Sequence, residues 1–191
     1  MTSEQLLAEL QDGSGAAPHY RFHPRVWEQD GCVVDLGCLG WDWSRLFMGR
    51  RRVVGADPAE ADTPSGSELW RGFVAPMTGE LQYGRGPSGM PAGSALIGGK
   101  LSAPALSWQA FKDRFVIQAI SLLKMNIEGM EYSLLPIVPQ SMADQIVVSF
   151  HHPFGSFSPS ATRAMIGFLS EWYWHCETCP KWGWHLFLRK R

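Results

Sequence analysis

The chain has 191 residues, with 17 Lys and Arg against 18 Asp and Glu, so its formal net charge is −1. A hydrophobic fraction of 45% supports a sizeable core and excludes a disordered protein. The near-zero charge removes the general electrostatic reason to bind nucleic acid or an anionic membrane. No apolar run is long enough to cross a bilayer, and the acidic start MTSEQLLAEL lacks the features of a secretory signal. We therefore expect a cytoplasmic protein with reduced cysteines and neither nucleic-acid nor membrane partners.

Residues 1–30 combine a short amphipathic start with a loop of polar and aromatic residues, and we interpret them as an N-terminal extension or lid. From 31 to 191, β-branched and apolar runs alternate with segments of helical spacing. The predicted elements are, in chain order, a strand at 32–36, a helix at 43–48, a strand at 53–57, short strands at 72–75 and 80–83, a helix at 107–115, a strand at 120–125, a short helix at 131–138, a strand at 145–150 and a helix at 158–171. This alternation is typical of one α/β domain with a mainly parallel sheet.

The tail carries two aromatic-rich runs, 172–176 and 184–188, on either side of a Pro-Lys-Trp-Gly turn, and this pattern predicts an antiparallel hairpin. Cys176 and Cys179 form one C-x-x-C pair, which is too little for a zinc site, and strand alternation would send them to opposite faces. We therefore expect no metal. The tail's tryptophans favour core packing, with a dimer surface as the alternative, so a homo-oligomer is left open.

Two acidic residues close the first two main strands. Asp35 is followed by Gly37 and Gly40 where the strand passes to a helix, the position at which open α/β sheets bind nucleotides. Only G-x-x-G is present, whereas a dinucleotide site needs G-x-G-x-x-G, which disfavours a nicotinamide-dependent oxidoreductase. Asp57, 22 residues after Asp35, can accept both ribose hydroxyls, and Asp35 can attract a cationic ligand group directly or through water. A nucleoside with an ammonium group and no pyrophosphate describes S-adenosylmethionine.

Three segments in the same order resemble the FkbM-type S-adenosylmethionine-dependent methyltransferases. They are VVDLG at 33–37 with Gly40 and Ser44, VVGADP at 53–58, and LLKMNIEGMEY at 122–132, the last being similar to the family's L-L-K-I-D-x-E-G-x-E. The resemblance covers roughly residues 31 to 152. It implies a Rossmann-like class I methyltransferase fold, α/β, with a mainly parallel seven-stranded sheet and a C-terminal antiparallel hairpin. Asn126 and Ser149 stand where the family has aspartate and glutamate.

The resemblance also places the ends of the strands at 120–125 and 145–150 beside the methyl group of the donor. Transfer to a hydroxyl requires removal of a proton, and the candidate groups are Glu128, His151 and His152. Because the unperturbed pKa of histidine is about 6.5, we favour His151 or His152 as the base and Asn126 as a neutral positioning group near the cofactor. Either histidine could instead cap its strand end through the backbone.

Two further charged residues of this segment are interpreted as structural. Lys124 lies inside an apolar strand, where an ammonium requires a partner, so we expect it to pair with a nearby carboxylate. Glu131 lies at a predicted helix start, where it can satisfy open backbone amides, and Glu128 shares that option.

The leading hypothesis is an O-methyltransferase that acts on a hydroxyl of a small-molecule acceptor. The resemblance implies an acceptor such as a sugar or a polyketide. The alternative is a cofactor-binding pseudoenzyme without turnover, because the two replaced carboxylates, at 126 and 149, fall near the expected reaction centre.

Overall fold

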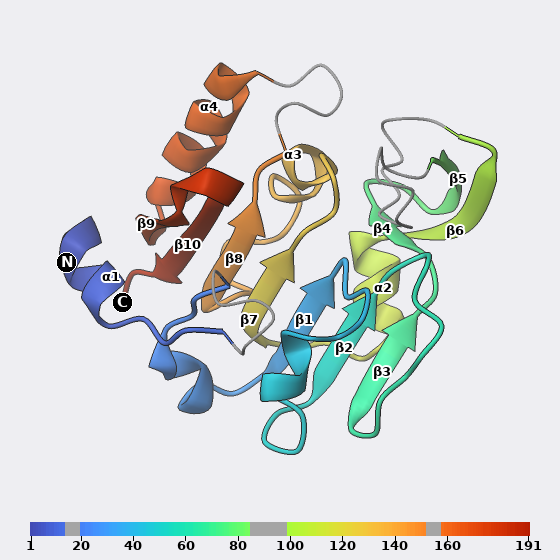
Figure 1. Ribbon diagram of the computed structural model, residues 1–191, viewed down its shortest axis with the longest axis horizontal. Helices are drawn as coiled ribbons and strands as arrows, with labels where there is room; N and C mark the ends of the chain where they lie inside the picture. Colours follow the sequence, from blue (N-terminus) through green and yellow to red (C-terminus); the bar gives the residue numbers. More distant parts are fainter. Residues whose placement is uncertain (14–19, 85–98, 152–157) are drawn as a thin grey trace.

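The computed structural model describes residues 1–13, 20–84, 99–151 and 158–191. Its centre is a seven-stranded sheet with the order β3-β2-β1-β7-β8-β10-β9 (Figure 1). The strands are β1 (Cys32–Leu36), β2 (Val53–Ala56), β3 (Ser67–Trp70), β7 (Ile120–Met125), β8 (Gln145–Ser149), β9 (Tyr173–Cys179) and β10 (Trp184–Arg189). The first five in this order run parallel, and β10 pairs antiparallel with β8 and β9. The predicted α/β fold with its C-terminal hairpin is confirmed.

The two faces of this sheet are covered differently, because alternate side chains of each buried strand point to opposite faces. Helices α2 (Trp108–Arg114), α3 (Glu131–Leu134) and α4 (Pro159–Ser170) pack on one face. The other face is covered by α1 (Ser3–Ala8), by the segment that follows it and by the connection after β1. No helix among the described residues is long and apolar enough to span a membrane.

The described part of the N-terminal extension is packed on the sheet. The side-chain amide of Gln145 exchanges hydrogen bonds with the backbone of His23 at 2.9 and 3.1 Å. Arg25 pairs with Asp144 at 2.7 Å, so this segment is tied to the start of β8. Its buried apolar side chains, together with those of α1, belong to the core on that face: Leu6, Leu10, Phe22 and Val26. The action of residues 1–30 as a lid stays a prediction.

The connection between β1 and β2 differs from its prediction. The helix predicted at 43–48 is wrong, since only a single 3-10 turn forms, at Ser44–Leu46. The residues on either side of this stretch, Trp41 and Gly49, have left-handed φ values of 55° and 79°, so the stretch between them is too short for a stable helix. The connection buries three large rings, Trp41, Trp43 and Phe47, in the same core cluster.

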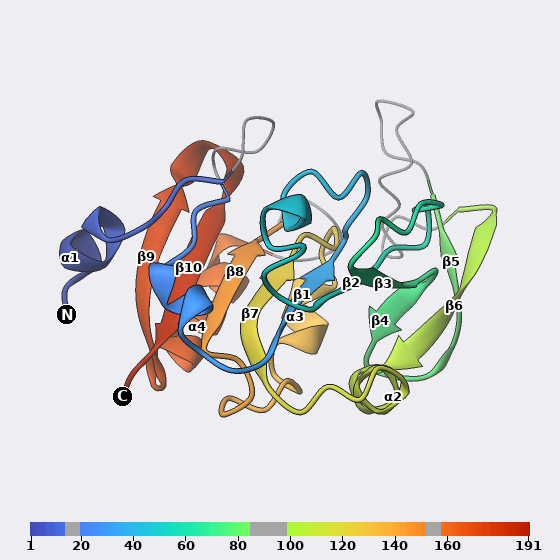
Figure 2. The ribbon, with the colours of Figure 1, turned by 90° about the horizontal axis from the view of Figure 1, so that it is seen from below.

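A second, three-stranded sheet lies at the β3 end of the large sheet, away from the hairpin (Figures 1 and 2). It has the order β4-β6-β5, with β4 (Phe73–Ala75), β5 (Gly79–Tyr83) and β6 (Leu101–Ser107). The short strands predicted at 72–75 and 80–83 are confirmed, whereas β3 and β6 were not predicted. Neither carries a clear strand pattern, because β3 is half-buried throughout and β6 contains Pro104.

The hairpin contains a bulge that changes the placement of its cysteines. The register shifts between Trp184 and His185, and Thr178 is left out of the ladder. The expectation that Cys176 and Cys179 lie on opposite faces is therefore wrong, because both pack against the same core cluster. In the described parts of the chain, no three or more His, Cys, Asp and Glu side chains are grouped so as to hold a metal ion.

Candidate functional site

The strand order reverses its direction between β1 and β7, and open α/β sheets bind ligands outside the carboxyl ends of the strands at such a point. The loops that follow these two strands touch each other there. The backbone amide of Asn126 donates to the backbone carbonyl of Leu36 at 3.0 Å. Gly37 has a φ of +82°, and a Cβ at this position would lie 2.0 Å from the carbonyl oxygen of Asn126. Glycine is therefore required at the first turn for close packing as well as for its backbone conformation.

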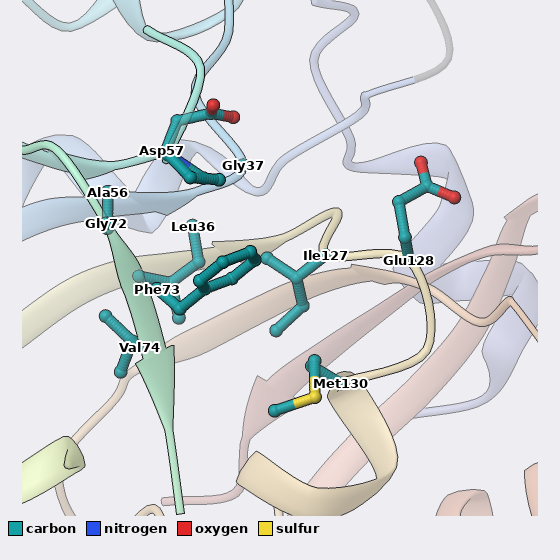
Figure 3. Close-up of a pocket in the computed structure, with 11 residues that line it drawn as sticks. Leu36, Gly37, Ala56, Asp57, Gly72, Phe73, Val74, Ile127, Glu128 and Met130 are labelled. Carbon is teal, nitrogen blue, oxygen red and sulfur yellow. The ribbon is translucent and has the colours of Figure 1, made fainter. Parts of the chain in front are cut away.

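A pocket that is partly open to solvent lies at this crevice (Figure 3). Its walls are mainly apolar, with Phe73, Ile127 and Met130 close together (Figure 3). The carboxylates of Asp57 and Glu128 both lie on one side of these apolar side chains, Asp57 at one edge of the pocket and Glu128 at the other (Figure 3). The lining residues are Leu36, Gly37, Ala56, Asp57, Pro58, Gly72, Phe73, Val74, Ile127, Glu128 and Met130. Strand β4 of the small sheet thus supplies part of the wall. An apolar lining with a few polar groups at its edge is typical of a small-molecule site.

Asp57 follows the last residue of β2 and keeps its carboxylate at the pocket although it is only 8% exposed. One oxygen accepts a hydrogen bond from the amide of Ala59 at 2.7 Å. Burial raises the pKa of this carboxyl, although the Ala59 amide and the charge of Lys124 act in the opposite direction. A carboxylate held in a desolvated position at a pocket edge is a candidate ligand-binding group.

Glu128 follows β7 on the other edge of the pocket and has an unusual backbone conformation. Its φ is 54°, a left-handed value that non-glycine residues rarely adopt, and Gly129 next to it has a φ of 103°. Burial raises the pKa of the Glu128 carboxyl, while the neighbouring His151 lowers it. Backbone strain of this kind concentrates at functional sites, where surrounding contacts maintain it.

Those contacts come from Glu131, which is fully buried at the start of α3. Its carboxylate accepts hydrogen bonds from the amides of Ile127 at 3.0 Å and Gly129 at 2.7 Å. The prediction that Glu131 satisfies open amides is confirmed. The sequence did not reveal that the same carboxylate, at the start of α3, also contacts His151, which follows β8.

His151 lies between two carboxylates just after β8. Its Nδ1 is 2.9 Å from Glu131 Oε1, and its Nε2 is 3.8 Å from Glu128 Oε2. Burial opposes protonation of the ring, but the hydrogen bond to Glu131 and the charges of both carboxylates outweigh it and raise the pKa of His151. His152, the second predicted base, lies outside the described residues.

Asp35 is paired inside the protein and is not part of the pocket lining. Lys124 Nζ lies 2.7 Å from Asp35 Oδ1 and donates to the carbonyl of Gly37 at 2.6 Å. The Ser44 hydroxyl donates a hydrogen bond to the other carboxylate oxygen of Asp35, and Asp35 is only 1% exposed. The predicted partner for Lys124 is confirmed. The predicted attraction of Asp35 for a cationic ligand group stays a prediction.

Gly40 and Asn126 also lie outside the pocket lining. The backbone amide of Gly40 donates to Glu60 Oε2 at 2.5 Å. Glu60 is a buried residue that the sequence did not single out, and it already binds this amide. The side-chain amide of Asn126 lies 3.5 Å from the hydroxyl of Tyr20. Of the predicted site residues, the pocket itself brings together Gly37, Asp57 and Glu128, with His151 adjacent to Glu128.

Tyr20 is a second residue that the sequence did not single out. Its ring packs edge-on against Trp184, with centroids 4.2 Å apart, and Lys124 Nζ lies 5.6 Å from the ring centroid. The indole nitrogen of Trp43 donates to the backbone carbonyl of Tyr20 at 2.9 Å. The N-terminal segment therefore brings an aromatic side chain to the ends of β1 and β7.

Comparison with known proteins shows the fold. No family model matches the chain, and no curated protein matches it. The crystal structure of methyltransferase FkbM from Methylobacillus flagellatus KT matches with a TM-score of 0.51 and 15% sequence identity, over 83% of this chain and 43% of that one. The chain thus spans less than half the length of that structure. The likeness confirms a Rossmann-like fold of the kind that this methyltransferase has.

Proposed function

We propose that this chain is a methyltransferase that binds S-adenosylmethionine in the pocket beside β1, β2 and β7. The acceptor in this proposal is a hydroxyl of a small molecule, of sugar or polyketide type. The observation that carries the proposal is the charge of the pocket: two carboxylates flank its apolar walls, and none of its eleven described lining residues is cationic. Such a lining suits a nucleoside with a positive charge and disfavours a pyrophosphate.

The residues present fit this cofactor. Asp57 stands at the end of β2, where an acidic residue accepts ribose hydroxyls, and the apolar side chains of Phe73, Ile127 and Met130 suit a purine ring. The negative charge of Glu128 favours a cation at the opposite edge. When bound, S-adenosylmethionine supplies an electrophilic methyl group on a sulfonium. The fold likeness to methyltransferase FkbM supports the same reaction class.

The remaining predicted residues receive roles around this pocket. His151 takes the proton of the acceptor hydroxyl, with His152 as the second candidate. Asn126 positions the reactants as a neutral group, and Asp35 holds the Gly37 turn through Lys124. Residues 31–191 form the methyltransferase domain in this proposal, and residues 1–30 form an N-terminal extension or lid.

Calorimetry with S-adenosylmethionine, S-adenosylhomocysteine and NADH tests the cofactor. We expect S-adenosylmethionine and S-adenosylhomocysteine to bind and NADH not to bind. Labelled methyl transfer to pools of sugars and polyketides then tests the reaction. Binding without transfer to any pool would favour the pseudoenzyme, which the asparagine at 126 and the serine at 149 make the second candidate. NADH binding without binding of the adenosyl compounds would contradict the proposal.

Replacing His151 with glutamine is expected to lower kcat about 100-fold or more, because general base catalysis contributes typically 10²–10⁴-fold. The affinity for S-adenosylmethionine should stay unchanged, since His151 does not line the pocket. Single-turnover methyl transfer and calorimetry measure the two quantities. His152→Gln serves as the companion variant, and full activity of both variants would remove histidine from the mechanism.

A further inference from the structure

Glu131 stands out because its fully buried carboxylate binds the loop just before its own helix and also contacts His151, which follows another strand. Oε2 accepts from the amide of Gly129, and Oε1 accepts from the amide of Ile127 while lying 2.9 Å from His151 Nδ1. Backbone amides can only donate, so both oxygens act as acceptors in the ionised form. The imidazole nitrogen that faces such a carboxylate carries the hydrogen. The contact therefore selects the His151 tautomer with its proton on Nδ1.

We propose that Glu131 is a positioning residue that orients His151 as the base of the methyl transfer, an inference that rests on the function proposed above. With Nδ1–H held by Glu131, the lone pair of the neutral ring is on Nε2. That atom lies 3.8 Å from Glu128 Oε2, and Glu128 lines the pocket. The basic nitrogen thus faces the pocket edge, while the other nitrogen faces the protein interior.

This arrangement accounts for each proton and charge in the step. The acceptor hydroxyl gives its proton to Nε2 of His151 as its oxygen forms the bond to the methyl carbon, and the sulfur keeps the electron pair of the broken carbon–sulfur bond. The imidazolium that results lies between the carboxylates of Glu131 and Glu128. Its charge is offset where it forms, without movement of either side chain.

Glu131 also couples the base to the pocket. By accepting from the amides of Ile127 and Gly129, it holds the loop in which Glu128 has a φ of 54°. Among the described residues, His151 faces Glu131 from α3, Glu128 from this loop and the backbone of Ser149 from β8. One carboxylate thus sets both the ring orientation and the backbone of the pocket edge.

The first test uses the unchanged protein. Nitrogen-15 spectra of the histidine rings above the pKa of His151 should show the Nδ1–H tautomer for this residue. A predominant Nε2–H tautomer would overturn the proposal. This measurement requires neither cofactor nor acceptor, so it tests the placement of His151 even if the proposed function fails.

The second test is Glu131→Gln, which keeps the shape of the side chain and removes its charge. In NMR titration, the pKa of His151 should fall, because a carboxylate within hydrogen-bond distance stabilises the imidazolium. In the unchanged enzyme, kcat should rise with pH as His151 loses its proton. In the variant that rise should move to lower pH, and the limiting kcat should fall on the order of tenfold.

Controls separate positioning from stability. Glu171→Gln, at the exposed C-terminal end of α4, should leave both the titration and kcat unchanged. An unchanged pKa of His151 in a folded Glu131→Gln variant would overturn the proposal. If the pKa does shift in the variant but the unchanged protein binds no S-adenosylmethionine, only the proposed function is contradicted. If Glu131→Gln does not fold, Glu131→Asp keeps the charge and should retain a raised pKa of His151. Loss of that raised pKa in a folded Glu131→Asp variant would count against the proposal.

Discussion

Replacing Asp57 with asparagine is expected to weaken the binding of S-adenosylmethionine by about 10- to 100-fold. A hydrogen bond to a charged acceptor contributes about 1.5–3 kcal/mol, and each 1.4 kcal/mol is about tenfold in affinity. The oxygen of asparagine can still accept from the amide of Ala59, so the local turn is preserved. The nitrogen that replaces the other oxygen cannot accept from a ribose hydroxyl. Calorimetry of the two proteins measures the difference.

The same variant should not be less stable than the unchanged protein. Burial raises the pKa of Asp57 in the folded chain, so keeping this carboxyl ionised at neutral pH costs folding free energy. Asparagine removes that cost, and the melting temperature should stay equal or rise. Asp62→Asn, an exposed acidic residue of the same loop, is the matched control for binding. Unchanged affinity in Asp57→Asn would remove Asp57 from the cofactor site.

Replacing Lys124 with methionine is expected to lower the free energy of unfolding by about 3–5 kcal/mol, because Asp35 is left as a buried carboxylate without its cation. Both side chains of this pair are almost fully buried, at 4% and 2% exposure. Burial opposes the charged form of Lys124, but the charge of Asp35, the neighbouring Tyr20 and the hydrogen bond to Asp35 together outweigh it and raise the pKa of the ammonium. Urea denaturation measures the loss.

A second substitution distinguishes the lost ion pair from lost packing. In the double variant with Asp35→Asn, no charge is left uncompensated, so part of the stability should return. Lys112→Met on α2, a lysine without a buried partner carboxylate among the described contacts, should change stability by less than about 0.5 kcal/mol. A loss equally small in Lys124→Met would show that the pair does not support the fold.

The central strands were predictable because their pattern is local. Strands β1, β2, β7 and β8 are buried at every position, so each one is a mainly apolar or β-branched run. Ser107 and Ser158 mark the starts of α2 and α4, because each hydroxyl accepts a hydrogen bond from the backbone amide three residues on, at Ala110 and Ala161. Strand β6 was not predicted because its stability depends on pairing with β4 and β5, which the sequence between 101 and 107 does not display.

The sequence by itself determined that acidic residues end the first two main strands, that a glycine turn follows Asp35, and that Lys124 needs an anionic partner. Only the tertiary structure decided that this partner is Asp35, because register places the two opposite each other on neighbouring strands. It alone also brought Glu131 to His151 and Tyr20 to Asn126. Local residue patterns specify strands and turns, whereas strand order determines which distant side chains meet, and no short stretch of sequence encodes that order.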